Sequence, residues 1–147
     1  MSVEIVGFNL ERDYNYVIST FEDMYASNPN FIKSRKSLEI FEEEIKSFNK
    51  SSRTYLTLLV EGKVKGYLFC VFRDDFSSGL TVWTIQKLYI DKEYRRRNYA
   101  TKLMEKAKEI AKINHASAIE LHSFEANKEF YEKLGFKIVG YSMEMKL

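Results

Sequence analysis

The sequence is poor in the residues from which covalent and metal frameworks are built. It holds one cysteine and two histidines among 147 residues, which excludes a disulfide framework and leaves no pattern of metal ligands. The cysteine, Cys70, lies within the apolar run YLFCVF, so we expect a buried core residue rather than a catalytic thiol. Such sparse use of cysteine is typical of a reducing compartment, and we expect a cytoplasmic protein.

Strong net charge and long apolar runs are also missing. The 23 basic and 21 acidic side chains leave a net charge of +2, so we expect neither a nucleic acid nor an anionic membrane as partner. No apolar run approaches the roughly 20 residues that span a bilayer, and the first residues lack the basic and apolar regions of a secretory signal. The composition, with 45% hydrophobic residues, is that of one globular domain over residues 1–147.

Proline occurs once, at Pro29, and it separates two helical patterns. A candidate strand at Val3–Phe8 precedes the first pattern, and Ser34 or Ser37 is the candidate N-cap of the second. Both patterns repeat apolar residues at helical spacing. The first stripe consists of Tyr14, Val17, Ile18, Phe21, Met24 and Tyr25, and the second of Leu38, Phe41, Ile45 and Phe48.

In the middle of the chain, the pattern of apolar residues changes from helical spacing to one that is typical of strands. Residues 54–60 and 63–72 are rich in β-branched, aromatic and leucine side chains, and Glu61-Gly62 between them predicts a tight hairpin. Both runs are nearly continuous in apolar residues, which is typical of central strands covered on both faces. A polar loop then leads to a third predicted strand at residues 80–90.

The last third of the chain returns to a helix and short strands. An amphipathic pattern predicts a helix over residues 98–113, and a strand is expected at 118–122. A short helix should end at Leu134, with Gly135 as its left-handed cap. Two further strands are expected at 136–140 and 142–146. The order of elements predicts one mixed α/β domain with a βαβ-like unit between residues 80 and 122.

The segment LYIDKEYRRRNYATKLM, residues 88–104, carries the clearest chemical signal. A strand ends, a basic turn follows and a helix begins, so unpaired amides and the helix dipole favour an anion there. Arg95, Arg96 and Arg97 add side chains that bind phosphate in forked geometry. A solvated basic helix start remains the alternative, and a nucleic-acid patch is the weaker one because the chain is nearly neutral.

At these residues the chain resembles the GNAT superfamily of N-acetyltransferases, whose phosphate-binding turn follows the pattern [RQ]-x-x-G-x-[GA]. Arg95 matches the first position and Ala100 the last, while Asn98 replaces the middle glycine. Asparagine is the residue besides glycine that best tolerates a positive φ, so we expect Asn98 to be left-handed. The segment FYEKLGF, residues 130–136, is similar to the C-terminal motif of the same family.

The resemblance implies the fold and the cofactor. The expected fold is α/β (α+β), with a mixed, mostly antiparallel central sheet of six to seven strands flanked by about four helices. The expected cosubstrate is acetyl-CoA, with its pantetheine arm along the strand and its diphosphate on the helix N-terminus. The implied cofactor-binding residues are Leu88, Tyr89, Ile90, Arg95, Arg96, Arg97, Asn98, Tyr99, Ala100, Thr101 and Asn127.

The resemblance also implies the chemistry. A backbone N–H near Leu88 or Tyr89 would polarise the thioester carbonyl, and Tyr131 matches the tyrosine that protonates the departing thiolate. No nucleophile pattern is present, which fits direct attack by an amine. The family often has an acidic base on the strand before Leu88, but this chain has none there. The substitutes are water, Glu22, Glu120 and His122, although a histidine at a strand end is more often structural.

The predicted function is transfer of an acetyl group from acetyl-CoA to a primary amine that the sequence does not identify. The alternative is an acyl-CoA-binding module without efficient catalysis, which fits Asn98 and the missing carboxylate. The candidates for the wall of an acceptor pocket are aromatic, although core packing explains them better; they are Tyr14, Tyr16, Phe21, Tyr25 and Phe31. The resemblance also allows a homodimer.

Overall fold

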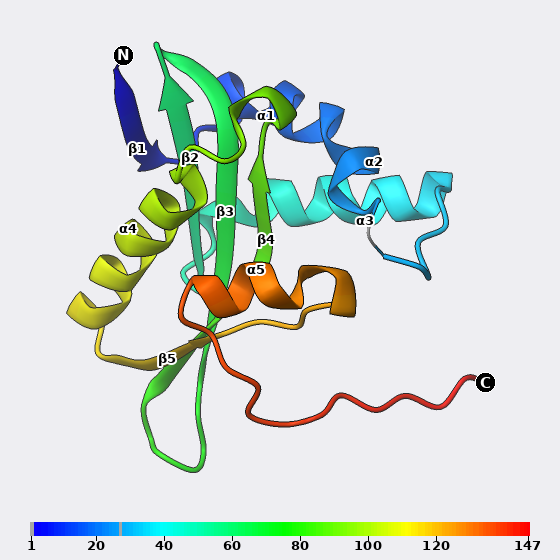
Figure 1. Ribbon diagram of the computed structural model, residues 1–147, viewed down its shortest axis with the longest axis vertical. Coiled ribbons are helices and arrows are strands. Elements are labelled where there is room, and N and C mark those ends of the chain that lie inside the picture. Colours follow the sequence, from blue (N-terminus) through cyan, green and yellow to red (C-terminus); the bar gives the residue numbers. More distant parts are fainter. Residues whose placement is uncertain (1, 27) are drawn as a thin grey trace.

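The computed structural model describes residues 2–26 and 28–147, and its centre is a five-stranded sheet in the order β1-β2-β3-β4-β5. The strands are β1 (Val3–Gly7), β2 (Arg53–Val60), β3 (Lys63–Asp74), β4 (Thr81–Ile90) and β5 (Ala116–Glu120). Neighbours from β1 to β4 are antiparallel, and β5 runs parallel to β4 (Figure 1). The mixed, mostly antiparallel sheet of the prediction is therefore confirmed.

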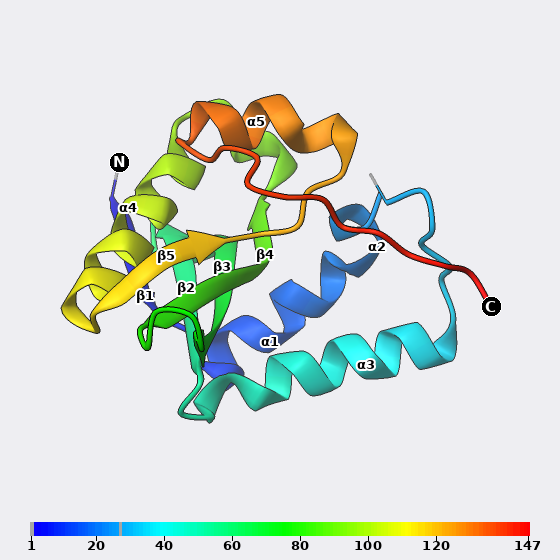
Figure 2. The ribbon, with the colours of Figure 1, turned by 90° about the horizontal axis from the view of Figure 1, so that it is seen from below.

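Helices cover both faces of this sheet. Figure 2 shows α4 (Tyr99–Ile113) on one face, and α1 (Leu10–Ser19) and α3 (Arg35–Lys46) on the other. The short helices α2 (Phe21–Met24) and α5 (Lys128–Lys133) lie near the end of β4. Single 3₁₀ turns follow α3 and precede α4 and α5, at Ser47–Asn49, Lys92–Tyr94 and Glu125–Asn127. Within the described ranges, no helix is long and apolar enough to cross a membrane.

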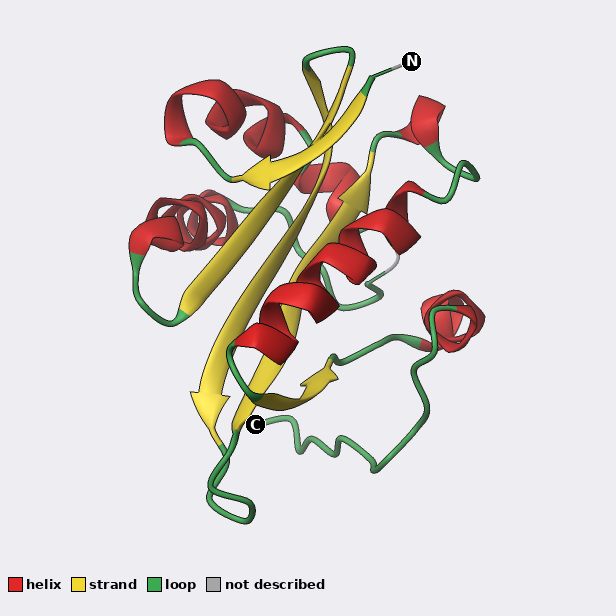
Figure 3. Cartoon of the chain, turned by 90° about the vertical axis from the view of Figure 1, so that its left-hand side faces the viewer, coloured by secondary structure: helices red, strands yellow, loops and turns green. Residues whose placement is uncertain are grey.

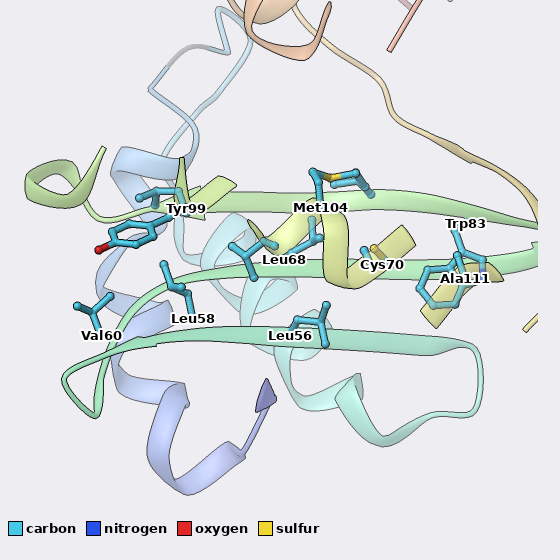
Figure 4. Close-up of a cluster of buried hydrophobic side chains, with 13 residues drawn as sticks. Leu56, Leu58, Val60, Leu68, Cys70, Trp83, Tyr99, Met104 and Ala111 are labelled. Carbon is cyan, nitrogen blue, oxygen red and sulfur yellow. The ribbon is translucent and has the colours of Figure 1, made fainter. Parts of the chain in front are cut away.

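Each face of the sheet has its own apolar core, as the continuous apolar runs predict. The α4 side is aliphatic with a few large rings, and Figure 4 shows much of it. The α1 and α3 side is mainly aromatic. Its members are Phe8, Val17, Phe21, Phe41, Ile45, Tyr55, Tyr67, Phe69 and Tyr89. Cys70 belongs to the α4 side, and burial raises the pKa of its thiol to about 12, so the expectation of an inert core cysteine is confirmed.

Local chemistry explains the boundaries of several elements. Glu61 and Gly62 both have positive φ, 53° and 76°, as a two-residue hairpin requires. Ser34 caps α3 and exchanges hydrogen bonds with Ser37 in a capping box. The first helical stripe is broken at Thr20, whose hydroxyl bonds the carbonyl of Val17 at 2.7 Å. The N-terminal pattern therefore forms two helices, α1 and α2, instead of one.

A β-bulge at Gln86 sets the faces of β4. Lys87 pairs with Phe69 but Ile85 pairs with Cys70, so Gln86 is the extra residue. The insertion changes the alternation, and Leu88 and Ile90 pack on the same core as Trp83 and Ile85. Lys87 and Tyr89 consequently face α1 and α3. Figure 3 shows β4 running beside α4 in the middle of the molecule.

Three expectations about element number and position are wrong. The described chain has five strands and five α-helices, where six to seven strands and about four helices were expected. Residues 136–140 and 142–146 are irregular, because they pair with no described strand, and apart from Phe136 their large apolar side chains stay exposed. The last strand occupies Ala116–Glu120 rather than 118–122, because His115 turns the chain with a φ of 59° directly after α4.

Candidate active site

A cavity of about 780 Å³ lies where β4 passes into α4, and its size is typical of small-molecule sites. Three segments that are distant in the sequence line it: α2, the β4–α4 junction, and α5 with the turn before it. Every predicted site residue except Arg97 lines this cavity. The lining residues from the prediction are Leu88, Tyr89, Ile90, Arg95, Arg96, Asn98, Tyr99, Ala100, Thr101, Asn127 and Tyr131.

One wall of the cavity is an unpaired edge of β4. β5 pairs with β4 only from Thr81 to Thr84, and the two strands then diverge (Figure 1). The other edge of β4 is paired with β3. Directly after β4, the N–H of Asp91 donates to the carbonyl of Lys65 on β3 at 2.8 Å. Because alternate residues of an antiparallel strand direct their backbone groups to opposite edges, the N–H of Leu88 faces the open edge. The N–H of Tyr89 faces β3.

The turn before α4 uses two left-handed residues. Arg96 and Asn98 each have a φ of 63°, which confirms the conformation expected of Asn98. Asn98 is the N-cap, but its side chain accepts no capping hydrogen bond. The first hydrogen bond within the helix runs from the N–H of Lys102 to the carbonyl of Asn98, at 3.1 Å. Amides of the first helical turn are thus left at the cavity, where the helix dipole favours an anion.

The three arginines have different roles in the structure. Arg95 is held by the protein: its Nε donates to the carbonyl of Ile90 at 2.8 Å, and a terminal nitrogen lies 3.0 Å from Asp23. The Arg97 guanidinium lies over the ring of Tyr94, 5.2 Å from its centroid, and is outside the cavity lining. Arg96 lines the cavity and makes no ion pair within the described residues, so its charge is available to a ligand.

Tyr131 contributes a partly buried phenol to the part of the cavity that α5 lines. Its ring packs edge-on against Phe130 and Phe136, with centroids 5.1 and 5.9 Å away. Desolvation raises the pKa of Tyr131, so the phenol keeps its proton at neutral pH. Phe130 is 40% exposed, and both Phe130 and Tyr131 line the cavity.

Asp23 is a cavity residue that sequence reasoning missed. Its Oδ2 accepts a hydrogen bond from the hydroxyl of Tyr89 at 2.7 Å and from Arg95, and its Oδ1 lies 3.1 Å from the Lys92 ammonium. Burial opposes ionisation, but the bonds from Tyr89 and Lys92 and the charge of Arg95 outweigh it and lower the pKa of Asp23. No local motif marks this residue, because its partners lie in a distant segment.

The candidate bases do not line the cavity. Glu22 pairs with Lys33, Glu120 with Arg73, and His122 packs against Phe124. The strand position before Leu88 holds a buried cation, Lys87, which pairs with Glu44 between the rings of Tyr25 and Phe41. Burial opposes its charge, but Tyr25 and Glu44 together raise the pKa of Lys87. This position therefore supplies no base.

The geometry is that of a site for an extended, anionic ligand: an open strand edge next to a helix N-terminus. A family comparison agrees, because residues 18–136 match the model of the acetyltransferase (GNAT) family. The chain belongs to the GNAT family. Members of this family use acetyl-CoA as cosubstrate. No curated protein matches the sequence closely enough to be called a relative.

Solved structures share the GNAT fold over the whole chain. A possible acetyltransferase from Clostridium difficile 630 is 18% identical with a TM-score of 0.82, covering 100% of this chain and 98% of its own. An aminoglycoside acetyltransferase from an uncultured soil metagenomic sample is 20% identical with a TM-score of 0.74, covering 100% of this chain and 99% of its own. Glucosamine-6-phosphate N-acetyltransferase from Arabidopsis thaliana is 17% identical with a TM-score of 0.70, covering 99% of each chain. At these identities the likeness concerns the fold alone.

Proposed function

We propose that this GNAT protein transfers an acetyl group from acetyl-CoA to a primary amine by direct attack in a ternary complex. The observation that carries the proposal is the shared cavity. The open edge at Leu88, the N-terminus of α4 and the phenol of Tyr131 all line it. These are a hydrogen-bond donor for the developing oxyanion, a site for the diphosphate of the cofactor and a proton donor for the departing thiolate.

The residues present fit acetyl-CoA. An amide-rich arm can add to the open edge of β4 through the carbonyl of Leu88 and the N–H of Ile90, as an extended peptide adds to a sheet. A diphosphate suits the amides of residues 96–101, with Arg96 as the available counter-charge. Because Asp23 and Ile90 hold Arg95, we assign this side chain to fixing the turn rather than to gripping the phosphate. Bound here, acetyl-CoA supplies an activated acyl group.

The protein's part in the reaction follows from these positions. The N–H of Leu88 donates to the carbonyl oxygen of the thioester and stabilises the negative charge that develops when the neutral amine attacks. The C–N bond forms, the C–S bond breaks, and Tyr131 gives its proton to the departing thiolate. The attacking amine loses its proton to water, and Tyr131 regains a proton from water. None of the candidate carboxylates or histidines lines the cavity, and the lowered pKa makes Asp23, which does line it, a poor base.

The experiment measures binding and turnover separately. Calorimetry with CoA and acetyl-CoA tests the cavity, and CoA release in the presence of a panel of primary amines tests transfer. We expect binding and amine-dependent CoA release. Binding without release from any amine would favour the acyl-CoA-binding module, and absence of binding at millimolar CoA would refute the proposal.

A further inference from the structure

The cavity contains one acidic side chain among its described lining residues, and this is Asp23 on α2. The other charged lining residues are Arg95, Arg96 and Lys133, which are cationic and suit the cofactor. A protonated amine that enters the cavity therefore meets a single carboxylate. The Asp23 side chain is 22% exposed, so the carboxylate is accessible but partly desolvated, which strengthens an ion pair.

The two oxygens of Asp23 are held in different ways. Oδ2 accepts from the hydroxyl of Tyr89 and from Arg95, at 2.7 and 3.0 Å, and both donors are themselves fixed in the fold. Oδ1 is held by the ammonium of Lys92 at 3.1 Å, and the Lys92 side chain is 68% exposed. Lys92 carries the same functional group as an amine acceptor, on a flexible surface side chain. Such exposed ion pairs are weak and easily exchanged.

We propose, on the basis of the proposed acetyl transfer, that Asp23 Oδ1 binds an ammonium group of the acceptor in place of Lys92. Oδ2 stays with Tyr89 and Arg95, so the carboxylate keeps its orientation when the cation on Oδ1 is exchanged. Asp23 and Leu88 line the same cavity, so an ammonium bound to Asp23 shares the cavity with the open edge of β4.

The nitrogen on Asp23 is not the nitrogen that reacts. A nucleophilic amine must be neutral, whereas an ammonium has no free electron pair. Asp23 is a poor acceptor for the extra proton, because Tyr89 and Arg95 stay hydrogen-bonded to Oδ2 after Lys92 has left and still favour the ionised carboxylate. The acceptor class is therefore one with at least two basic nitrogens, a diamine or polyamine, of which one is held as a cation and another is acetylated.

The experiment compares 1,4-diaminobutane with 1-aminobutane as acceptors, because they differ by one ammonium. The readout is the ratio of their kcat/KM values at saturating acetyl-CoA. We expect the parent protein to prefer the diamine by about tenfold, the effect of one charged hydrogen bond. Asp23→Asn should bring this ratio close to one. Any disturbance of Arg95 or Tyr89 affects both amines and cancels in the ratio.

Two further variants sharpen the test. Lys92→Gln removes the competing ammonium and should raise kcat/KM for the diamine by roughly two- to fivefold, as expected for an exposed ion pair. This variant also keeps the test decisive if Asp23→Asn fails to fold. Glu22→Gln changes the neighbouring carboxylate, which pairs with Lys33 outside the cavity lining, and should leave the ratio as in the parent.

The outcomes separate this inference from the proposed function. Turnover of both amines with equal kcat/KM in the parent, or a ratio that Asp23→Asn does not change, would refute the role of Asp23 while acetyl transfer stands. An unchanged diamine kcat/KM in Lys92→Gln would count against it as well. Bound CoA without turnover of any amine would refute the proposed function, and this inference with it.

Discussion

At the scale of single residues, the candidate site depends on backbone conformations that few side chains tolerate. Arg96 and Asn98 both lie in the left-handed region, two residues apart. This places the amides of the turn and of the first helical residues at one cavity wall. Asn98 occupies the N-cap position, but its side chain makes no capping hydrogen bond. What it contributes is the ability to adopt a left-handed backbone conformation at little cost.

Substitution of Asn98 tests this use of its backbone. Asn98→Gly should keep stability and CoA affinity, because glycine adopts a φ of 63° without strain. Asn98→Val should lower the free energy of unfolding by about 1–2 kcal/mol and weaken CoA binding, since a β-branched residue clashes there. Urea denaturation and calorimetry measure both effects, and a harmless valine variant would contradict the argument.

Tyr131 is the residue on which the proposed chemistry depends. Tyr131→Phe retains the ring contacts with Phe130 and Phe136 and removes the proton donor. Turnover should fall by roughly 10²–10⁴-fold if the phenol acts as general acid, with CoA affinity and melting temperature nearly unchanged. Steady-state rates with a confirmed amine, measured beside CoA titrations, decide the matter. A variant as active as the parent would assign Tyr131 to packing alone.

At the scale of elements, the position of β4 depends on its close approach to β3. A Cβ on Gly66 would lie 2.7 Å from the carbonyl oxygen of Tyr89 and 3.0 Å from Cδ1 of Ile90. Both contacts are in the part of β4 that lines the cavity. The absence of a side chain at Gly66 therefore lets the strand lie where Leu88 and Ile90 can present their open edge.

Gly66→Ala should disturb this arrangement. Because the nearest atom is backbone, the strand must move, and we expect a loss of about 1–3 kcal/mol in the free energy of unfolding with weaker CoA binding. Gly7→Ala is the matched control, because Gly7 is also in a strand and a Cβ there meets nothing within 4 Å. Equal effects of the two changes on stability and CoA affinity would show that the close approach is unimportant.

The elements that could be predicted are those with a regular spacing of apolar residues or a clear turn sequence. The hairpin at Glu61-Gly62, the doubly covered strands and α4 follow from alternation, turn chemistry and helical spacing. The strands expected at 136–140 and 142–146 were predicted from the same alternation, but they do not form. A strand must pair with the edge of a sheet, and the local sequence does not indicate whether such an edge is available. Thr20 divides the first helical stripe through a hydroxyl bond that a hydrophobic pattern does not contain.

At the scale of the whole molecule, the cavity is assembled from α2, β4, α4 and α5. The part on β4 and α4 could be predicted, because strand, turn and helix are contiguous in the sequence. Asp23 could not, since its donors Tyr89 and Arg95 lie 66 and 72 positions away. Residues whose chemistry depends on such distant partners become visible only in the folded chain.

The open edge of β4 should also appear in amide hydrogen exchange. The N–H of Leu88 has no strand beside it among the described residues, whereas the N–H of Tyr89 faces β3, so neighbouring amides of one strand should exchange at very different rates. Deuterium uptake resolved by residue should be fast at Leu88 and Ile90 and slow at Tyr89. Bound CoA should slow exchange of the Leu88 amide and leave exchange of the Tyr89 amide unchanged. Uniform protection of the amides along β4 in the free protein would contradict an unpaired edge.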